Sequence, residues 1–120
     1  MKVLIADDES FIIDLLEDYL TMGGHTVVSA FDANTMVARA AENPPDIIFM
    51  DINMPGIRDE NRTPQIQIPP ALANIPVVAV TGSEIAKLRE LGLPESIPVL
   101  VKPIEFPDMD AILAKITPKA

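Results

Sequence analysis

Four short apolar runs of this 120-residue chain each end in polar side chains that could take part in chemistry. Carboxylates follow two of these runs, and a hydroxyl and an ammonium group follow the others: Asp7 and Asp8, Asp51, Thr81, and Lys102. Carboxylates held close together repel one another and raise each other's pKa unless a cation lies between them. Oxygen ligands without histidine or cysteine suit a hard divalent cation, Mg²⁺ or Mn²⁺, which keeps positions open for phosphate oxygens.

The remaining two side chains fit the same chemistry. Lys102 offers a compact positive charge suited to a phosphate or a carboxylate, and Thr81 offers a hydroxyl donor to an anionic oxygen. Because an Asp carboxylate can act as a nucleophile in phosphoryl transfer, the set indicates an aspartyl-phosphate site centred on Asp51. Taken alone, Asp51 has a plainer explanation as a turn-capping residue.

Strands and helices must alternate to bring these residues together. Short apolar runs predict strands at about 3–6, 26–30, 46–50, 76–80 and 97–101, the second of them at or near a sheet edge. Helical spacing predicts helices at about 11–20, 33–41, 84–91 and 108–116. This alternation indicates an α/β fold with a parallel sheet, whose strands meet at one carboxyl edge, so the polar residues should converge there.

Several local features of the helices can be predicted. Asp8 or Ser10 should cap the first helix and Asp32 the second. Helical spacing should turn three sets of apolar side chains toward the core: Phe11, Ile12, Leu15, Leu16, Tyr19 and Leu20; Ile85, Leu88 and Leu91; and Met109, Ile112, Leu113 and Ile116. Residues 57–74 are polar at first and then rich in proline, which predicts a short, distorted helix or an irregular crossover.

Composition narrows the class of protein. Eighteen acidic residues against nine basic ones give a net charge of −9, and no basic cluster is present, which argues against direct nucleic-acid binding. The absence of cysteine excludes disulfides and thiolate chemistry. No apolar run is long enough to span a membrane and no signal peptide is evident, so we expect a cytoplasmic protein. Residues 1–120 should form one domain.

The motifs taken together resemble the receiver domain of two-component response regulators, the single-domain chemotaxis regulators in particular. They span the chain: Asp7-Asp8, Asp51-Ile52-Asn53-Met54-Pro55-Gly56, Thr81-Gly82 and Lys102-Pro103. The resemblance implies a flavodoxin-like, doubly wound sheet of five parallel strands in the order 2-1-3-4-5, with helices on both faces. The third helix should be short or distorted.

The resemblance also implies a role for each matching residue. Asp51 would accept the phosphoryl group, Asp8 and Asp51 would bind Mg²⁺ directly, Asp7 through water, and Asn53 through its backbone carbonyl. Lys102 would pair with Asp51 or the phosphoryl group, Thr81 would bind a phosphoryl oxygen, and Pro103 would follow a cis peptide bond. The donor would be a histidine kinase, a phosphotransfer protein or an acyl phosphate, and the receiver would catalyse only its own phosphorylation and dephosphorylation.

Some positions depart from the family pattern. Val99 stands where the family usually has Tyr or Phe, and a β-branched aliphatic has no ring to swing inward as a switch. Asn53 and Ser83 occupy positions that tune dephosphorylation in the family. Val99 and the irregular third helix support an alternative, a pseudo-receiver adaptor that works without phosphorylation. An aspartyl-phosphate phosphatase and a flavin-binding domain fit less well, because Asn53 replaces a second acid and the first turn is acidic.

The resemblance implies an output protein as well as a phosphoryl donor. No membrane partner is expected, because no apolar run is long enough to span a bilayer. The output surface would lie beside Val99. The sequence leaves the cognate kinase, the output partner and the oligomeric state open.

Overall fold

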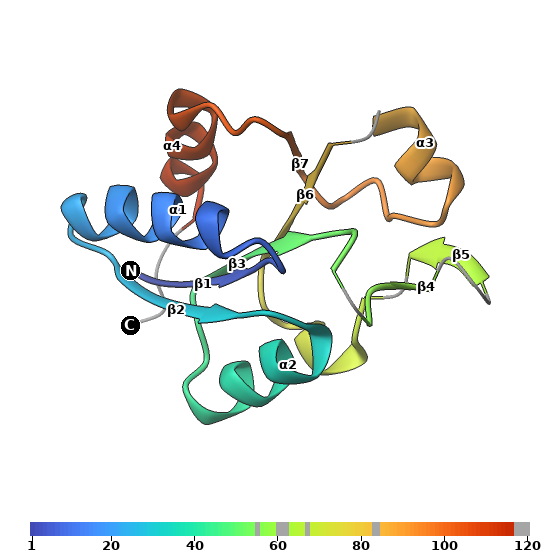
Figure 1. Cartoon of the computed structure of the whole chain (residues 1–120), viewed down its shortest axis with the longest axis horizontal. Helices are drawn as coiled ribbons and strands as arrows, with labels where there is room; N and C mark the ends of the chain where they lie inside the picture. Colours follow the sequence, from blue (N-terminus) through green and yellow to red (C-terminus); the bar gives the residue numbers. More distant parts are fainter. Residues whose placement is uncertain (55, 60–62, 67, 83–84, 117–120) are drawn as a thin grey trace.

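A sheet of five parallel strands forms the centre of the computed structural model, which describes residues 1–54, 56–59, 63–66, 68–82 and 85–116 (Figure 1). The strands lie in the order β2-β1-β3-β6-β7. They are β1 Lys2–Ala6, β2 Thr26–Ala30, β3 Ile47–Asp51, β6 Val77–Thr81 and β7 Val99–Val101. Numbered within the sheet alone, this is the predicted order 2-1-3-4-5, with the second strand at an edge as expected.

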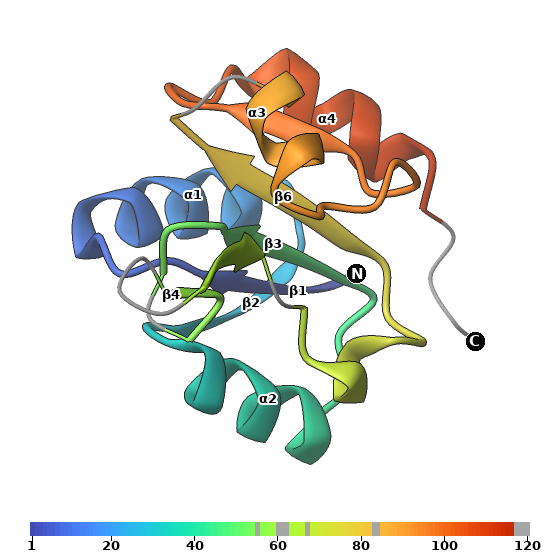
Figure 2. The same ribbon diagram turned by 90° about the vertical axis from the view of Figure 1, so that its right-hand side faces the viewer.

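Helices cover both faces of the sheet, as predicted (Figure 2). On one face lie α1 Ser10–Met22 and α4 Phe106–Ala114, and on the other α2 Ala33–Glu42, the 3₁₀ helix η1 Pro70–Leu72 and α3 Ile85–Glu90. The strands between them are apolar on both sides, and β3 is buried along its whole length. Within the parts of the chain that the structure describes, no helix has the length and apolarity needed to cross a bilayer.

The crossover between β3 and β6 is irregular, in agreement with the prediction. It holds an antiparallel hairpin, β4 Arg58–Asp59 paired with β5 Thr63–Ile66, and then the single turn η1. Proline cannot continue a helix because it lacks a backbone N–H. The hairpin is tied to the end of α3, since the Ile66 N–H donates to the Leu91 carbonyl at 2.8 Å and the Ile66 side chain is buried.

The two predicted helix caps had different outcomes. Asp32 caps α2 as expected, because its Oδ1 accepts a hydrogen bond from the Thr35 N–H at 2.7 Å. The prediction for α1 was wrong: Glu9 is the N-cap residue, and no side chain caps this helix. Asp8 lies one residue too early for this role, and Ser10 is already the first helical residue.

The predicted inward face of α1 was partly wrong. Phe11 is 71% exposed and Leu15 is 44% exposed, whereas Ile13, Leu16 and Leu20 face the sheet. With 3.6 residues per turn, a helix that buries positions 13, 16 and 20 turns positions 11 and 15 outward.

The predicted inward faces of α3 and α4 were more accurate. Leu88 is buried and Leu91 packs against the same core, although Ile85 is exposed. Met109 and Leu113 are buried, and Ile112 and Ile116 pack beside them.

The loop after β3 approaches α2 closely at Gly56. A Cβ at this position would lie 2.6 Å from the Ala33 Cβ, and the backbone φ is +92°. We therefore expect Gly56→Ala to lower the free energy of unfolding by about 2 to 3 kcal/mol, through both the clash and the positive φ. Urea denaturation measures the change.

Gly24 provides a matched control for this prediction. It has φ +88°, but a Cβ added at this position would have nothing within 4 Å. Gly24→Ala should therefore cost only the backbone term of about 1 kcal/mol. Equal losses in the two variants would contradict a steric role for Gly56.

Candidate functional site

The sheet brings the acidic residues of two strands side by side. Asp7 directly follows β1 and Asp51 ends β3, and these neighbouring strands pair in register from Val3 with Ile47 to Ala6 with Met50. Both carboxylates are almost fully buried, with 2% of each residue exposed. Because each lies at the carboxyl end of its strand, the two occupy the edge where α/β sheets bind ligands.

The next two strands add the hydroxyl and the ammonium group. Thr81 is the last residue of β6 and is fully buried. Lys102 directly follows β7, and its backbone N–H donates to the Thr81 carbonyl at 2.7 Å. The Lys102–Pro103 peptide bond is cis, as the family resemblance implies.

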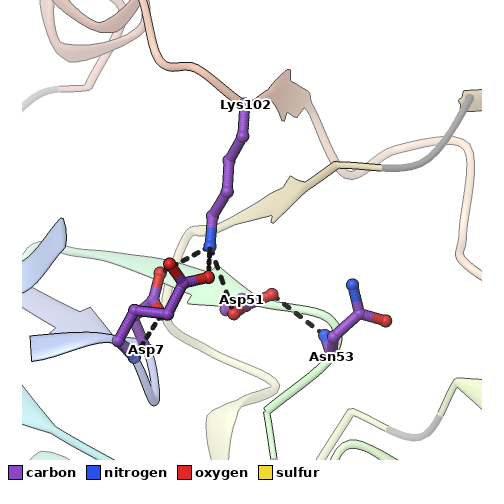
Figure 3. Close-up of polar contacts among 5 residues, drawn as sticks. Asp7, Asp51, Asn53 and Lys102 are labelled. Carbon is purple, nitrogen blue, oxygen red and sulfur yellow. Dashed lines mark hydrogen bonds and ion pairs between the residues drawn. The ribbon is translucent and has the colours of Figure 1, made fainter. Parts of the chain in front are cut away.

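The Lys102 side chain reaches across the sheet edge into the acidic cluster (Figure 3). Its Nζ lies 3.1 Å from Asp7 Oδ2, 3.1 Å from Glu9 Oε1 and 3.4 Å from Asp51 Oδ2. The side chain is only 17% exposed, so these ion pairs are shielded from water at the Asp7 and Asp51 ends. One ammonium group thus contacts three carboxylates, two from the segment that follows β1 and one from the end of β3.

Backbone donors fix the orientation of the two buried carboxylates. Asp51 Oδ1 accepts a hydrogen bond from the Asn53 N–H at 3.0 Å, while its Oδ2 faces Lys102. Asp7 uses its oxygens in the same way, with Oδ1 accepting from the Glu9 N–H at 2.9 Å and Oδ2 paired with Lys102. Each carboxylate is therefore held at one oxygen by the backbone and at the other by the ammonium group.

Burial and neighbouring groups shift the pKa values of both Asp51 and Lys102. Burial raises the pKa of Asp51 from 3.8 to about 6, against the Asn53 N–H and Lys102, which both favour the ionised form. Burial alone would lower the pKa of Lys102, but the carboxylates of Asp7, Asp51 and Glu9 raise it above its usual value. Asp51 is therefore mostly ionised at neutral pH while keeping an unusually high affinity for protons.

The donor set fits a hard divalent cation. One carboxylate oxygen from each of Asp7, Asp8, Glu9 and Asp51 lies within 4.8 Å of the others. Opposite ligands of an octahedral Mg²⁺ are about 4.2 Å apart, so a single ion could contact several of these oxygens. Asp8 and Glu9 are exposed, and they form the solvent side of the cluster.

Glu9 was not predicted from the sequence. Its acidic character and its position directly after Asp7-Asp8 were the available signal, but a turn residue at a helix start gives no indication of where its side chain points. The structure places its carboxylate against Lys102.

The structure describes two of the remaining predicted residues, Asn53 and Val99. Asn53 is exposed and follows β3 closely. Val99 is partly buried, starts β7 and stands beside Ala79 in the sheet. Ser83 lies outside the residues that the structure describes, as does Pro55.

Comparisons with known proteins agree on a single family. The family model for the response regulator receiver domain matches residues 3–114. Response regulator PleD of Caulobacter vibrioides is 34% identical over 105 residues, which cover 87% of this chain and 23% of PleD. The chain therefore spans less than a quarter of the length of this relative.

Solved structures of other proteins share the fold. Chemotaxis protein CheY4 of Vibrio cholerae is 23% identical with a TM-score of 0.72, covering 97% of this chain and 98% of its own. SdrG of Pseudomonas melonis, in its BeF3-activated conformation, is 28% identical with a TM-score of 0.67, covering 94% of this chain and 92% of its own. The likeness to CheY4 concerns the fold alone.

The raised pKa of Asp51 predicts a pH-dependent effect of Asp51→Asn. Because the folded protein binds this proton more tightly than the unfolded chain, the contribution of Asp51 to stability is present below pH 3.8 and lost as the pH rises through about 6. We compare the free energy of unfolding of Asp51→Asn with that of the wild type without added metal. The difference should shift in favour of the variant by about 2 kcal/mol as the pH rises from 4 to 7.5.

Urea denaturation at several pH values measures this change. Asp14→Asn, which removes an exposed carboxylate of α1 far from Lys102, is the control for the loss of one acidic group. A difference between Asp51→Asn and the wild type that stays constant across this range would contradict a raised pKa at Asp51.

Proposed function

The chain belongs to the response regulator receiver domain family of two-component signalling, and on this premise we propose that it accepts a phosphoryl group on Asp51 in a Mg²⁺-dependent reaction. Phosphorylation would then change its affinity for a protein partner. The observation that carries the proposal is the buried Asp51 carboxylate at the carboxyl end of β3, held by the Asn53 N–H and facing Lys102. The donor would be a histidine kinase, a phosphotransfer protein or a small acyl phosphate.

In the proposed reaction an Asp51 carboxylate oxygen attacks the phosphorus atom of the donor. A new oxygen–phosphorus bond forms, the bond from phosphorus to the donor breaks, and the donor group leaves with its electron pair. Asp51 must be ionised to attack, and a pKa of about 6 leaves most molecules competent at pH 7.5. The Asn53 N–H fixes Oδ1, so Oδ2 on the Lys102 side is the better placed nucleophile.

Charge compensation falls to Lys102 and a cation. Lys102 Nζ, 3.4 Å from Asp51 Oδ2, would pair with a phosphoryl oxygen once Asp51 is modified. The hydroxyl of Thr81, at the end of the neighbouring strand β6, would donate a hydrogen bond to a second phosphoryl oxygen. A divalent cation held by Asp7, Asp8, Asp51 and the Asn53 carbonyl would offset the negative charge of the transferred group. Mg²⁺ is the expected ion, and Mn²⁺ could replace it.

Catalysis in this proposal is limited to the protein's own phosphorylation and dephosphorylation. The added group carries about −1.5 to −2 charges, and the loops after β3 and β6 would rearrange around it. The likeness to SdrG, whose structure is described as BeF3-activated, supports a conformational response. We propose a cytoplasmic location and protein partners, without a nucleic-acid or membrane partner.

A pseudo-receiver adaptor is the second candidate function. It is favoured by Val99, because this side chain stands at the start of β7 and lacks a ring that could swing inward. The intact acidic cluster and the ion pair from Lys102 to Asp51 weigh against it, since binding alone would not need two buried carboxylates.

Incubation with acetyl phosphate tests the proposed phosphorylation directly. We expect an intact-mass increase of one phosphoryl group in the presence of Mg²⁺, because the Asp51 carboxylate at the end of β3 is held by the Asn53 N–H with its Oδ2 facing Lys102. The adduct should be absent with Asp51→Asn and without magnesium. A folded wild-type protein that forms no adduct would favour the adaptor instead.

Thr81→Ala separates the switch from the chemistry. We expect it to form the adduct on Asp51 but to lose at least half of the phosphorylation-dependent change in amide hydrogen exchange at residues 52–57, because the donor hydroxyl is absent. Thr81→Ser keeps the hydroxyl and should retain the wild-type response. A full response in Thr81→Ala would exclude a switching role for this hydroxyl.

A further inference from the structure

An apolar groove lies at the amino end of β6, away from the carboxyl edge that holds Asp51. Its volume is about 580 Å³, and it is bounded by the segment around η1, the loop that precedes β7 and the last turn of α4. In the sheet register Val77 pairs with Ile48, whereas Asp51 pairs with Val80 near the other end of β6. Figure 2 shows β6 running between the η1 crossover segment and α4.

The groove exists because the sheet stops early on this side. β7 pairs with β6 only from Val99 opposite Ala79, so Val77 and Val78 extend past the end of β7. Pro98 cannot extend the ladder by donating a hydrogen bond to Val77, since proline has no N–H. The neighbouring crossover contributes a single 3₁₀ turn instead of a full helix. Both features border the apolar groove at this end of β6.

The chemistry of the lining differs from that of the rest of the protein. Apart from Ser96 and Lys115, every described residue that lines the groove is aliphatic or proline. The chain carries 18 acidic residues, yet none of them is among the described lining residues. Lys115, the C-cap residue of α4, is the one charged group among them. The groove therefore combines a large apolar surface with one positive charge.

We propose that this groove is a binding site for a small monocarboxylate with an alkyl chain. The volume lies within the range of about 300 to 1,000 Å³ that is typical of small-molecule sites. The alkyl chain would lie along Val77, Ile97 and Ile112, and the carboxylate would pair with Lys115 at the rim. Charge complementarity selects an anion, since the positive charge of Lys115 would repel a cationic ligand.

The single positive charge at the groove, that of Lys115, also limits which anions could bind there. A nucleotide or a phosphorylated peptide carries several charges and usually needs several cationic or polar donors. Here the burial of alkyl carbon supplies most of the affinity and Lys115 supplies the preference for a carboxylate. The site does not include Asp51, so ligand binding should persist in Asp51→Asn.

Decanoate is the probe for this proposal, used below its micelle-forming concentration with decanol as the uncharged analogue. In a ¹H–¹⁵N NMR titration of the full chain, we expect shifts concentrated at residues 68–78, 94–98 and 112–116, with decanoate bound more tightly than decanol. Lys115→Gln should lower the affinity for decanoate about threefold and leave the affinity for decanol unchanged. Lys87→Gln, an exposed lysine on α3 that does not line the groove, is the charge control.

Two alanines on the same segment give a matched pair for the apolar contacts. Ala73 is exposed and lines the groove, whereas Ala71 is exposed two residues earlier and does not line it. Ala73→Trp should fill the groove and lower the affinity for decanoate at least tenfold. Ala71→Trp should bind decanoate as tightly as the wild type does. Retained folding of both variants is checked by circular dichroism.

Three outcomes would overturn the proposal. Scattered or absent shifts with decanoate would show that no carboxylate site is present, and unchanged binding in Ala73→Trp would place the ligand elsewhere. Concentration-dependent self-association in sedimentation velocity that Ala73→Trp abolishes would assign the groove to a second copy of the chain.

Discussion

The ion pairs of Lys102 constrain the rest of the structure. Two carboxylates, Asp7 and Asp51, are buried on neighbouring strands, and a buried charge is costly unless it is paired and hydrogen-bonded. The pairing group comes from the far side of β6, because Lys102 follows β7 and reaches over Thr81 to both acids. The observed order places β6 between β3 and β7, so the lysine side chain spans the end of one intervening strand to pair with the acids.

The irregular crossover has consequences at both ends of the sheet. At the carboxyl edge, the loop after Asp51 is anchored by Ile52, Met54 and Ile57, which are almost fully buried. A movement of this loop would have to disturb the core, or be transmitted to the end of α3 through the hydrogen bond from the Ile66 N–H to the Leu91 carbonyl. At the amino edge, the single turn η1 stands in place of a full helix and borders the groove beside the start of β6. One local departure from regular structure thus shapes the site and the groove alike.

The sequence was sufficient for the sheet and for the convergence of the site because both depend on strong local signals. Apolar runs that end in Asp7, Asp51, Thr81 and Lys102 mark buried parallel strands, and parallel topology alone places their ends together. Helix phase was less predictable. In α1 nearly every turn offers apolar residues, so the choice of Ile13 over Phe11 as the inward residue depends on packing against the sheet.

Other features depend on contacts that local patterns do not encode. The position of Glu9 against Lys102 joins residues 93 apart in sequence. The groove arises where β7 offers no ladder partner to Val77 and where the crossover lacks a full helix. Sequence periodicity reports only the elements that are present. The prolines of residues 57–74 predicted the irregularity, but they could not indicate that a hairpin would take its place.

Charge at the site explains why a lysine alone would not support the proposed phosphorylation. Four carboxylates are clustered at this edge and one ammonium group pairs with three of them, so an excess of three negative charges remains when all four are ionised. A phosphoryl group must compete with Asp7 and Glu9 for Lys102, and every carboxylate that loses this partner is left near others of the same sign. In the proposed reaction a divalent cation would supply the charge that Lys102 cannot. The proposed dependence on magnesium is therefore supported by the number of acids at this edge, to which Glu9 adds one.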